Sequence, residues 1–490
     1  MPIKYSVHKY NAYLTVYLSL VFGIVLSLLF VLIESAAAGA ARAQSELVAD
    51  VGLDSVFAEY NREVLKQYEL FFIDSSYGGE NGGIGMVETH LSKYMEYNLN
   101  PDKDLFLLGE NTLLKLKNPY LEIEGVSYAG DDDCMVWKAQ AVQYMKAVCG
   151  GDLVTTVKEH IDTVQRNGLT QRDAVREVAE QKRVFEEALT KKGIVEFDEE
   201  NADGFSYQKV SETFDRLIGG GLLMMVLPQG RSMSGAAVDG GPYFSQRRKN
   251  GQINQGTGLH NGLEKPDGFL DELIYDEYLM KMCGCFNQPK DGGLLQYQIE
   301  YILYGNGSDE ANLRRNTEVL FALRGVANLT SICADAEKKS EAELVSSVIC
   351  WLLAIPELTD ALTAILLGIW ALVEAAADVH CLLEGKRVPL MKKNSEWRTS
   401  LTGIFSGDLL GNGRETTGLS YQDYLRIFLG IMNRSEKAAR SLDIVEMDIR
   451  LTPGNGHFRI DRCLDYLEVN FGFEDSGGHD FVFRKCMCYE

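Results

Sequence analysis

The chain has 490 residues, 46% of them hydrophobic, so it can bury the core of two or three domains or of one elaborate domain. Its 70 acidic residues outnumber its 48 basic residues and leave a formal net charge of −22 at pH 7. That charge would repel phosphate backbones and anionic lipid surfaces, so it argues against nucleic acid and against a polybasic lipid contact. An acidic surface keeps a protein dispersed in water and by itself indicates no partner.

The most informative segment is the uncharged run of 22 residues from Ala12 to Ile33. A helix of that length, rising about 1.5 Å per residue, crosses a hydrocarbon core of about 30 Å. Lys4 and Lys9 precede the run and Glu34 follows it directly, so the positive-inside rule places the N-terminus in the cytoplasm. We expect a single-pass plasma-membrane protein, with residues 1–11 cytoplasmic, residues 12–33 in the bilayer and the remaining body extracellular.

A cleaved secretory signal is the alternative for this N-terminus, because Ala41-Arg42-Ala43 has the Ala-x-Ala form of a cleavage site. The apolar part of a signal spans only about 7–15 residues, however, and the motif lies ten residues beyond the run. A retained helix is therefore favoured. Residues 34–70 are predicted to continue it outward as far as about Lys66, because Leu47, Val51 and Ala58 recur at helical spacing.

Residues 71–228 are predicted to form an α+β region. A helical stretch near Glu88–Tyr97 precedes the segment 113–129, whose alternating apolar positions are typical of paired strands. The three acids Asp131–Asp133 then begin a helix, and we assign them to its macrodipole rather than to a calcium site.

A charged helical hairpin is predicted from Gly151 to about Lys192, with a break at Asn167-Gly168 and with Thr170 as the cap of the second helix. The run Gly219–Pro228 is predicted to be a buried strand or a short core segment. Residues 229–268, which are rich in Gly, Ser, Asn and Gln, are predicted to be a long loop that ends this region.

Residues 269–490 are predicted to be mainly helical. A helix near Phe269–Met282 comes first, and the alternating apolar residues of 294–305 then predict a strand. Ser308 is predicted to cap a helix that runs to about Ala327.

The second apolar region consists of two uncharged runs of 13 residues, Leu344–Pro356 and Ala361–Val373. Runs of this length are typical of buried core helices rather than of membrane spans, and the acids Glu357 and Asp360 between them would be costly in lipid. We therefore predict a buried helix pair.

The last part of the chain is predicted to hold one more helix and a hairpin. Ser420 and Asp423 have the spacing of a capping box, and the helix that they begin is expected to reach past Ile444. Two strand-like segments around a Ser-Gly-Gly turn then predict a terminal β-hairpin. Together, the elements predict an α+β fold with one long N-terminal helix and a large mixed ectodomain.

The cysteines and histidines indicate no definite site. Cys283/Cys285 and Cys486/Cys488 could in principle form a tetrahedral zinc site, but nothing in the sequence brings the two pairs together. Buried or disulfide-bonded cysteines are the simpler interpretation, since the ten cysteines are an even count in an exported chain.

No catalytic motif is found. The chain has no P-loop, no dinucleotide-binding glycine motif, no EF-hand and no HExxH. Asp378, His380 and Cys381 are close in sequence, but neighbouring helical side chains point apart, so they form no evident dyad. We predict no catalytic residue, no metal and no cofactor.

The order of the segments resembles one family, the bacterial proteins catalogued as domain of unknown function five-seven-zero-two, found mainly in clostridia. The resemblance spans nearly the whole chain, and its matching stretches are residues 14–46, 57–78, 298–313, 370–393 and 418–450. Members of this family are similar at the N-terminus to minor pseudopilins of Tad-type tight-adherence pilus systems. In pilin-like subunits the first half of the long helix packs in the membrane and the second half lies against a globular head.

The resemblance to Tad pseudopilins also implies a processing site. Alignment on Thr15-Val16 puts Ala12 at the glycine before the cut, so the candidate processing site is the bond between Ala12 and Tyr13. Tyr17 stands where the pilins carry a glutamate that registers subunits during assembly, and the chain departs from the pattern there.

These observations predict a non-enzymatic, membrane-anchored surface protein that serves as an accessory or minor pseudopilin-like component of a Tad-like pilus or secretion apparatus. Its expected partners are the lipid bilayer and other pilin-like subunits or a secretion platform, and not nucleic acid. The alternative is an anchored extracellular hydrolase or ligand-binding protein unrelated to pili.

Overall fold

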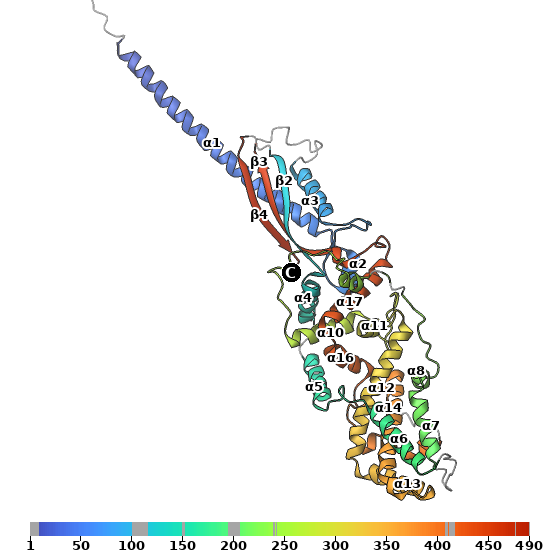
Figure 1. The fold of residues 1–490 in the computed structure, drawn as a ribbon. Helices are drawn as coiled ribbons and strands as arrows, with labels where there is room; N and C mark the ends of the chain where they lie inside the picture. Colours follow the sequence, from blue (N-terminus) through green and yellow to red (C-terminus); the bar gives the residue numbers. More distant parts are fainter. Residues whose placement is uncertain are drawn as a thin grey trace, which may run out of the picture. The chain divides into compact units, whose positions relative to one another are not determined.

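The computed structural model describes residues 9–99, 116–148, 152–194, 206–238, 241, 243–406, 410, 417–475 and 477–489 (Figure 1). The chain forms two compact units. The first, which we call the stem unit, consists of Met1–Asp132, Asn254–Leu263 and His457–Glu490. The second, the helical unit, consists of Asp133–Ile253 and Glu264–Gly456. The stem unit is therefore built from segments that are far apart in the sequence.

The stem unit begins with α1, Lys9–Phe57, an uninterrupted helix of 49 residues that contains the whole predicted membrane segment (Figure 1). The prediction of a long N-terminal apolar helix is confirmed. The helix ends at Phe57 rather than near Lys66, because the Asn61 side chain accepts hydrogen bonds from two backbone N–H groups and starts a separate helix, α2 (Arg62–Tyr68).

The sheet of the stem unit is antiparallel and is built around β3 (Cys463–Glu474). β2 (Lys117–Tyr128) pairs with β3, and so do β4 (Asp480–Cys488) and the two-residue strand β1 (Ile73–Asp74). The terminal hairpin is thus confirmed as β3 and β4. The strands predicted to pair with each other within 113–129 are instead one strand whose partner lies near the end of the chain, and residues 113–115 lie outside the described part.

One face of the sheet packs against the second half of α1 and against α3 (Ile84–Leu99). Alternation along β3 explains this packing, because every second side chain from Leu467 to Phe473 points to the same face. The core consists of Val48, Ala49, Leu53, Val56, Phe57, Ile73, Val87, Leu91, Met95, Leu121, Tyr128, Leu464, Leu467, Val469, Phe471 and Phe473. The helix predicted near Glu88–Tyr97 is confirmed as α3.

α1 packs closely against α3 at Gly52. A Cβ atom there would lie 3.1 Å from Leu91 Cδ1 and 3.4 Å from Met95 Cγ, whereas a Cβ on Gly39 of the same helix would meet no atom within 4 Å. We expect Gly52→Leu to destabilise the stem unit by about 1–3 kcal/mol, because it overpacks this contact. Gly39→Leu is the matched control. Hydrogen exchange of α3 peptides should accelerate only in the Gly52 variant, and equal rates in both variants would contradict the packing argument.

The three acids Asp131–Asp133 begin a helix as predicted, but the first two bind backbone N–H groups of another segment in addition to lying at the helix N-terminus. α4 (Asp131–Val148) opens with Asp132, Asp133 and Cys134 at positive φ, a left-handed conformation that costs non-glycine residues about 1–2 kcal/mol each. Within the stem unit, Asp131 accepts a hydrogen bond from the N–H of Gly256 and Asp132 accepts one from Leu259, both at 2.9 Å. The first two carboxylates therefore hold the segment 254–263 in place.

The helical unit is built from helices of very different lengths. Its helices after α4 are α5 (Asp152–Arg166), α6 (Ala174–Lys191), α7 (Tyr207–Ile218), α8 (Leu222–Val226), α9 (Phe244–Lys249), α10 (Phe269–Met282), α11 (Gln298–Tyr304), α12 (Asp309–Ala334), α13 (Ala336–Leu352), α14 (Thr359–Glu384), α15 (Leu401–Ser406), α16 (Tyr421–Ile431) and α17 (Arg434–Arg450). Short 3₁₀ turns occur at Pro356–Leu358 and Asn394–Glu396, and in the stem unit at Ile460–Arg462.

α14 is the central helix of this unit. It packs against α12, α13, α6, α7 and α8, and 94% of its most apolar stretch is buried inside the protein. The two apolar runs of the sequence thus form parts of α13 and α14, and the second run is a core helix as predicted. The first run is not wholly buried, because Leu344 and Trp351 of α13 are 69% and 75% exposed. Small residues allow close packing here, since a Cβ on Gly368 would lie 2.4 Å from Val178 Cγ2 of α6.

Several local predictions hold in the helical unit. Two helices are present over 151–192 as predicted, α5 and α6, although Asp173 rather than Thr170 caps α6 through its side chain. They do not form the predicted hairpin, because α5 packs against α10 and α16 whereas α6 packs against α12 and α14. The helix predicted near Phe269–Met282 has those bounds, and Ser308 caps α12 through a hydrogen bond from the N–H of Ala311. Gly219–Pro228 is a short core segment and contains the helix α8.

Two predictions in this unit are wrong. The predicted strand 294–305 is α11, in which five successive residues are buried, so the alternating apolar residues did not mark one face of a strand. The helix that begins with the Ser420–Asp423 capping box ends at Ile431. Asn433 then accepts hydrogen bonds from two N–H groups and starts α17, so a second cap interrupts the predicted helix.

Candidate functional site

The first candidate site is the exposed apolar part of α1. Every residue from Tyr13 to Ile33 is exposed, and no part of this apolar stretch of α1 is buried inside the protein. The segment is strongly apolar and carries no charge. Water is a poor solvent for such a surface. The helix is also long and apolar enough to span a membrane.

The polar side chains of this segment are satisfied within the helix. Ser19 and Ser27 each donate a hydrogen bond of 2.8 Å to a backbone carbonyl, that of Val16 and that of Ile24 respectively. Backbone groups in a helix are paired as well, so the segment presents few unpaired polar groups to a lipid environment. Gly23 lies between the two serines, with no atom near the position of an added Cβ.

The two residues of the candidate processing site, Ala12 and Tyr13, are consecutive residues of α1 near its N-terminal end. Tyr13 is 81% exposed, and Tyr17, one turn further along, is also exposed. The bond between Ala12 and Tyr13 thus lies at the start of the apolar surface, so cleavage there would leave nearly all of that surface on the protein.

The apolar surface passes directly into the packed part of α1. Ala41 and Ser45 are fully buried, and the stripe of buried residues continues to Phe57. In the middle of β4, Lys485 forms an ion pair with Asp50 and donates a hydrogen bond to the carbonyl of Glu46. One rigid helix therefore joins the exposed apolar segment to the sheet.

The second candidate site is a buried ionic network in the helical unit. Glu374 and Asp378 lie four residues apart on one face of α14 and are both fully buried. Arg324 of α12 donates hydrogen bonds of 3.0 and 2.9 Å to Asp378 Oδ2. Lys392 pairs with both acids, and Arg398 Nη1 lies 2.6 Å from Asp378 Oδ1.

The electrostatics of this network favour a structural role. Burial alone would raise the pKa of Asp378, but the three surrounding cations hold that pKa at about 2. The carboxylate is thus fixed in its charged form and is a poor proton carrier near neutral pH. The sequence contained a signal for this network, two acids in an otherwise apolar helix followed by a basic segment, which requires buried ion pairs.

Asp378, His380 and Cys381 do not converge on one another. His380 Nδ1 lies 2.9 Å from the carbonyl oxygen of Val226, so the ring is held by a different helix. Burial raises the pKa of the Cys381 thiol above its usual range, which makes the reactive thiolate scarce. The structure therefore supports the reading of these residues as a structural group.

The cysteine pairs considered as a zinc site belong to different units. Cys283 and Cys285 lie in the helical unit, where burial raises the pKa of each thiol to about 12. Cys486 and Cys488 lie in the stem unit. Within the described ranges, no group of three or more His, Cys, Asp and Glu side chains could hold a metal ion. The described cysteines form no disulfide, and Cys149 lies outside the described residues.

A buried glutamate in the helical unit titrates near neutral pH. Glu300 Oε1 accepts hydrogen bonds from the Tyr421 hydroxyl at 2.6 Å and from the N–H of Phe286 at 2.9 Å. Burial nevertheless raises the pKa of Glu300 to about 7, because its charged form has lost its hydration.

This raised pKa predicts a pH-dependent stability. The folded protein binds the Glu300 proton more tightly than the unfolded chain does, so stability falls as the pH rises from about 4.5 to about 7. We expect Glu300→Gln to be more stable than the wild type at pH 8 by about 1–3 kcal/mol and to show a weaker pH dependence.

Urea unfolding of the detergent-solubilised protein, followed by tryptophan fluorescence, would measure this effect, because all four tryptophans lie in the helical unit. Glu341→Gln, an exposed site, serves as the control and should leave the pH profile unchanged. A Glu300→Gln variant that is less stable than the wild type at pH 8 would contradict the prediction.

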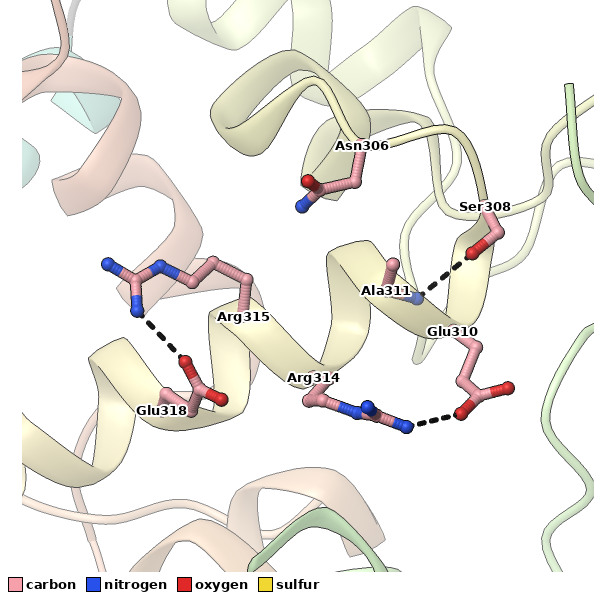
Figure 2. Close-up of a pocket in the computed structure, with 7 residues that line it drawn as sticks. All are labelled: Asn306, Ser308, Glu310, Ala311, Arg314, Arg315 and Glu318. Carbon is pink, nitrogen blue, oxygen red and sulfur yellow. Dashed lines mark hydrogen bonds and ion pairs between the residues drawn. The ribbon is translucent and has the colours of Figure 1, made fainter. Parts of the chain in front are cut away.

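A surface hollow of about 360 Å³ lies along the first turns of α12 (Figure 2). Figure 2 shows that its charged side chains pair along the helix, Arg314 with Glu310 and Arg315 with Glu318, at 2.6 and 2.9 Å. Pairs of this kind are common on exposed helix faces and give the hollow no charge of one sign. The hollow is lined by Asn306, Ser308, Glu310, Ala311, Arg314, Arg315 and Glu318.

The fold and the first site together define a class: an α+β protein whose N-terminal apolar helix could span a membrane and whose body packs on the same helix. Residues 200–475 match a family of unknown function, DUF5702, and the chain belongs to that family. Comparisons with curated proteins and with solved structures found no match.

Proposed function

We propose that this protein is a membrane-anchored surface protein that acts as an accessory, minor pseudopilin-like component of a Tad-like pilus or secretion apparatus and catalyses no reaction. The observation that carries the proposal is the single helix α1, whose first part is exposed and apolar and whose second part packs on the sheet of the stem unit. Pilin-like subunits divide their first helix in the same way.

The orientation follows from charge. Lys4 and Lys9 flank the cytoplasmic end of the apolar run in this proposal, and Glu34 begins the extracellular side. The acidic body then lies outside the cell, where its net charge favours solubility over contact with nucleic acid.

The proposed partner surface is the exposed face of α1 from Leu14 to Ile33, which packs against lipid and against the membrane helices of other pilin-like subunits or of a secretion platform. Helix contacts in lipid depend on close packing between small residues and on complementary shape rather than on the hydrophobic effect. Ser19, Gly23 and Ser27 recur every four residues and provide one narrow face of that kind.

The mature N-terminus and the cellular fraction of the native protein test this proposal. Mass spectrometry should find Tyr13 as the first residue, with the protein in the membrane or in a sheared surface fraction. Cleavage near Ala43 with release into the medium would overturn the proposal and favour a secreted protein. An uncut chain in the membrane would retain the anchor and remove the pseudopilin assignment.

Photo-crosslinking tests the partner independently. A photoreactive residue in place of Gly23 should crosslink to other membrane proteins, whereas the same residue at Val482, which is exposed on the outer face of β4, serves as the comparison. Crosslinks from position 23 to lipid alone would leave an anchored protein without subunit contacts in the membrane.

A further inference from the structure

A basic cavity in the helical unit stands out from the acidic chain. It has a volume of about 270 Å³ and lies between α9 and α17. Its lining is formed by Ser245, Arg248, Lys249, Ser435, Glu436, Ala439 and Arg440. Three cations and one acid thus line the cavity, in a chain whose net charge is −22.

The arginine of α9 is held rigidly at the cavity wall. Arg248 donates hydrogen bonds to the carbonyl oxygen of Ser435, at 3.2 Å, and to its hydroxyl, at 2.5 Å. Asp133, at the start of α4, forms an ion pair with the same guanidinium and accepts a hydrogen bond of 3.0 Å from the Ser435 hydroxyl. A guanidinium fixed in this way loses little conformational entropy when it binds an anion.

The arginine of α17 is fixed as well. Arg440 Nη1 donates hydrogen bonds to the carbonyl oxygens of Ile302 and Leu303, at 3.1 and 2.7 Å. Its second amino group lies 3.3 Å from Glu436, the acid of the cavity lining. These contacts position the charge of Arg440 at the cavity without removing it.

Lys249 supplies the third cation. It is exposed at the end of α9, and no ion pair is recorded for it with any described residue, in contrast to Arg248 and Arg440. When Asp133 is counted together with Glu436, the positive charges around the cavity still exceed the negative ones. The cavity therefore combines two fixed guanidinium groups, one exposed ammonium group and the hydroxyls of Ser245 and Ser435.

We propose that the cavity between α9 and α17 binds the phosphate group of an anionic ligand. Planar guanidinium forks and a lysine point charge are the side chains that proteins use for phosphate, and serine hydroxyls add neutral hydrogen bonds. The same chemistry would accept a free phosphate or the phosphodiester of a polymer or lipid headgroup. This site is independent of the apolar helix, so the membrane proposal and the phosphate proposal can fail separately.

Equilibrium dialysis of the full-length protein in detergent tests the site with two probes, inorganic phosphate and glycerophosphoglycerol, at constant ionic strength set with sodium chloride. We expect at least one probe to bind with a dissociation constant near or below the millimolar range. The probe with the lower dissociation constant then identifies the source of the phosphate group. Tighter binding of inorganic phosphate indicates a free phosphate, and tighter binding of the diester glycerophosphoglycerol indicates a polymer or a lipid headgroup.

The decisive variant is Lys249→Glu, which should weaken binding of that probe about tenfold or more because it reverses the charge of the exposed lysine in the cavity lining. Lys339→Glu, an exposed site on α13 with the same change in net charge, should weaken it less than twofold. Circular dichroism of both variants should match the wild type, because neither side chain is buried. Absence of binding by both probes, or equal losses in both variants, would overturn the proposal.

Discussion

Gly23→Asp combined with Leu26→Asp should release the protein from the membrane. The two positions lie at the middle of the apolar run, where each aspartate costs about 2.5–3.5 kcal/mol on insertion scales. Two such residues offset most of the gain from inserting a segment of this length. Carbonate extraction followed by immunoblotting would measure the membrane-bound fraction, which we expect to fall from nearly complete to a small remainder.

The control for this variant adds the same charge to the same helix. Ala40→Asp with Leu47→Asp places both acids at exposed positions beyond the apolar run and should leave the protein in the membrane. If the double variant at positions 23 and 26 stays fully membrane-bound, α1 does not act as the anchor. If both variants are released, added negative charge anywhere on α1 causes the release, and the result does not single out the apolar run.

Asp378→Asn should be the most destabilising single substitution in the helical unit. The carboxylate lies among Arg324, Lys392 and Arg398, and its loss leaves three buried cations with one remaining acid, Glu374. Breaking a buried ion pair by removing one partner costs about 3–5 kcal/mol, since the other charge stays buried without compensation. Urea unfolding followed by tryptophan fluorescence would measure the loss.

The same network sets the behaviour of the wild type in acid. The pKa of Asp378 in the folded protein, about 2, is below the ordinary value of 3.8, so its contribution to stability is complete above about pH 4. That contribution disappears as the pH falls from about 4 to 2. Asp360→Asn, at an exposed position of the same helix, is the matched control and should unfold like the wild type. Equal stability of the two variants would show that Asp378 is not essential to the core.

Local signals along the chain predicted much of the fold. The uncharged run from Ala12 to Ile33 predicted α1, and caps at Ser308 and Ser420 predicted the starts of α12 and α16. Alternation failed for α11, because its residues are buried on all sides and the packing of neighbouring helices decides its conformation. The second cap, Asn433, was missed, although Asn is among the residues preferred at a helix N-cap.

The pairing of distant segments could not be predicted in this way. β2 has the alternation of a strand, yet nothing in residues 117–128 indicates that its partner is 463–474 rather than an adjacent strand. The buried network around Asp378 shows the same limit. Glu374 and Asp378 indicated that cations were needed, but only the fold brings Arg324 from α12 and Lys392 from beyond α14 to them.

The division of the stem unit between the two ends of the chain constrains the order in which the protein can mature. α1 is synthesised before β3 and β4, and the sheet that packs on it is incomplete until both of these strands have emerged. At about 5–20 residues per second, β2 waits some tens of seconds with an unpaired edge, a state that favours aggregation.

The helical unit lies within this interval of the sequence, and its folding shortens the flexible chain that separates β2 from β3, which lowers the entropic cost of closing the sheet. A ribosome that stops before residue 463 would leave a complete helical unit joined to a stem without its central strand. Completion of the stem therefore reports that translation has passed β4, and a quality-control protease that recognises the unpaired strand would remove molecules that stopped before it.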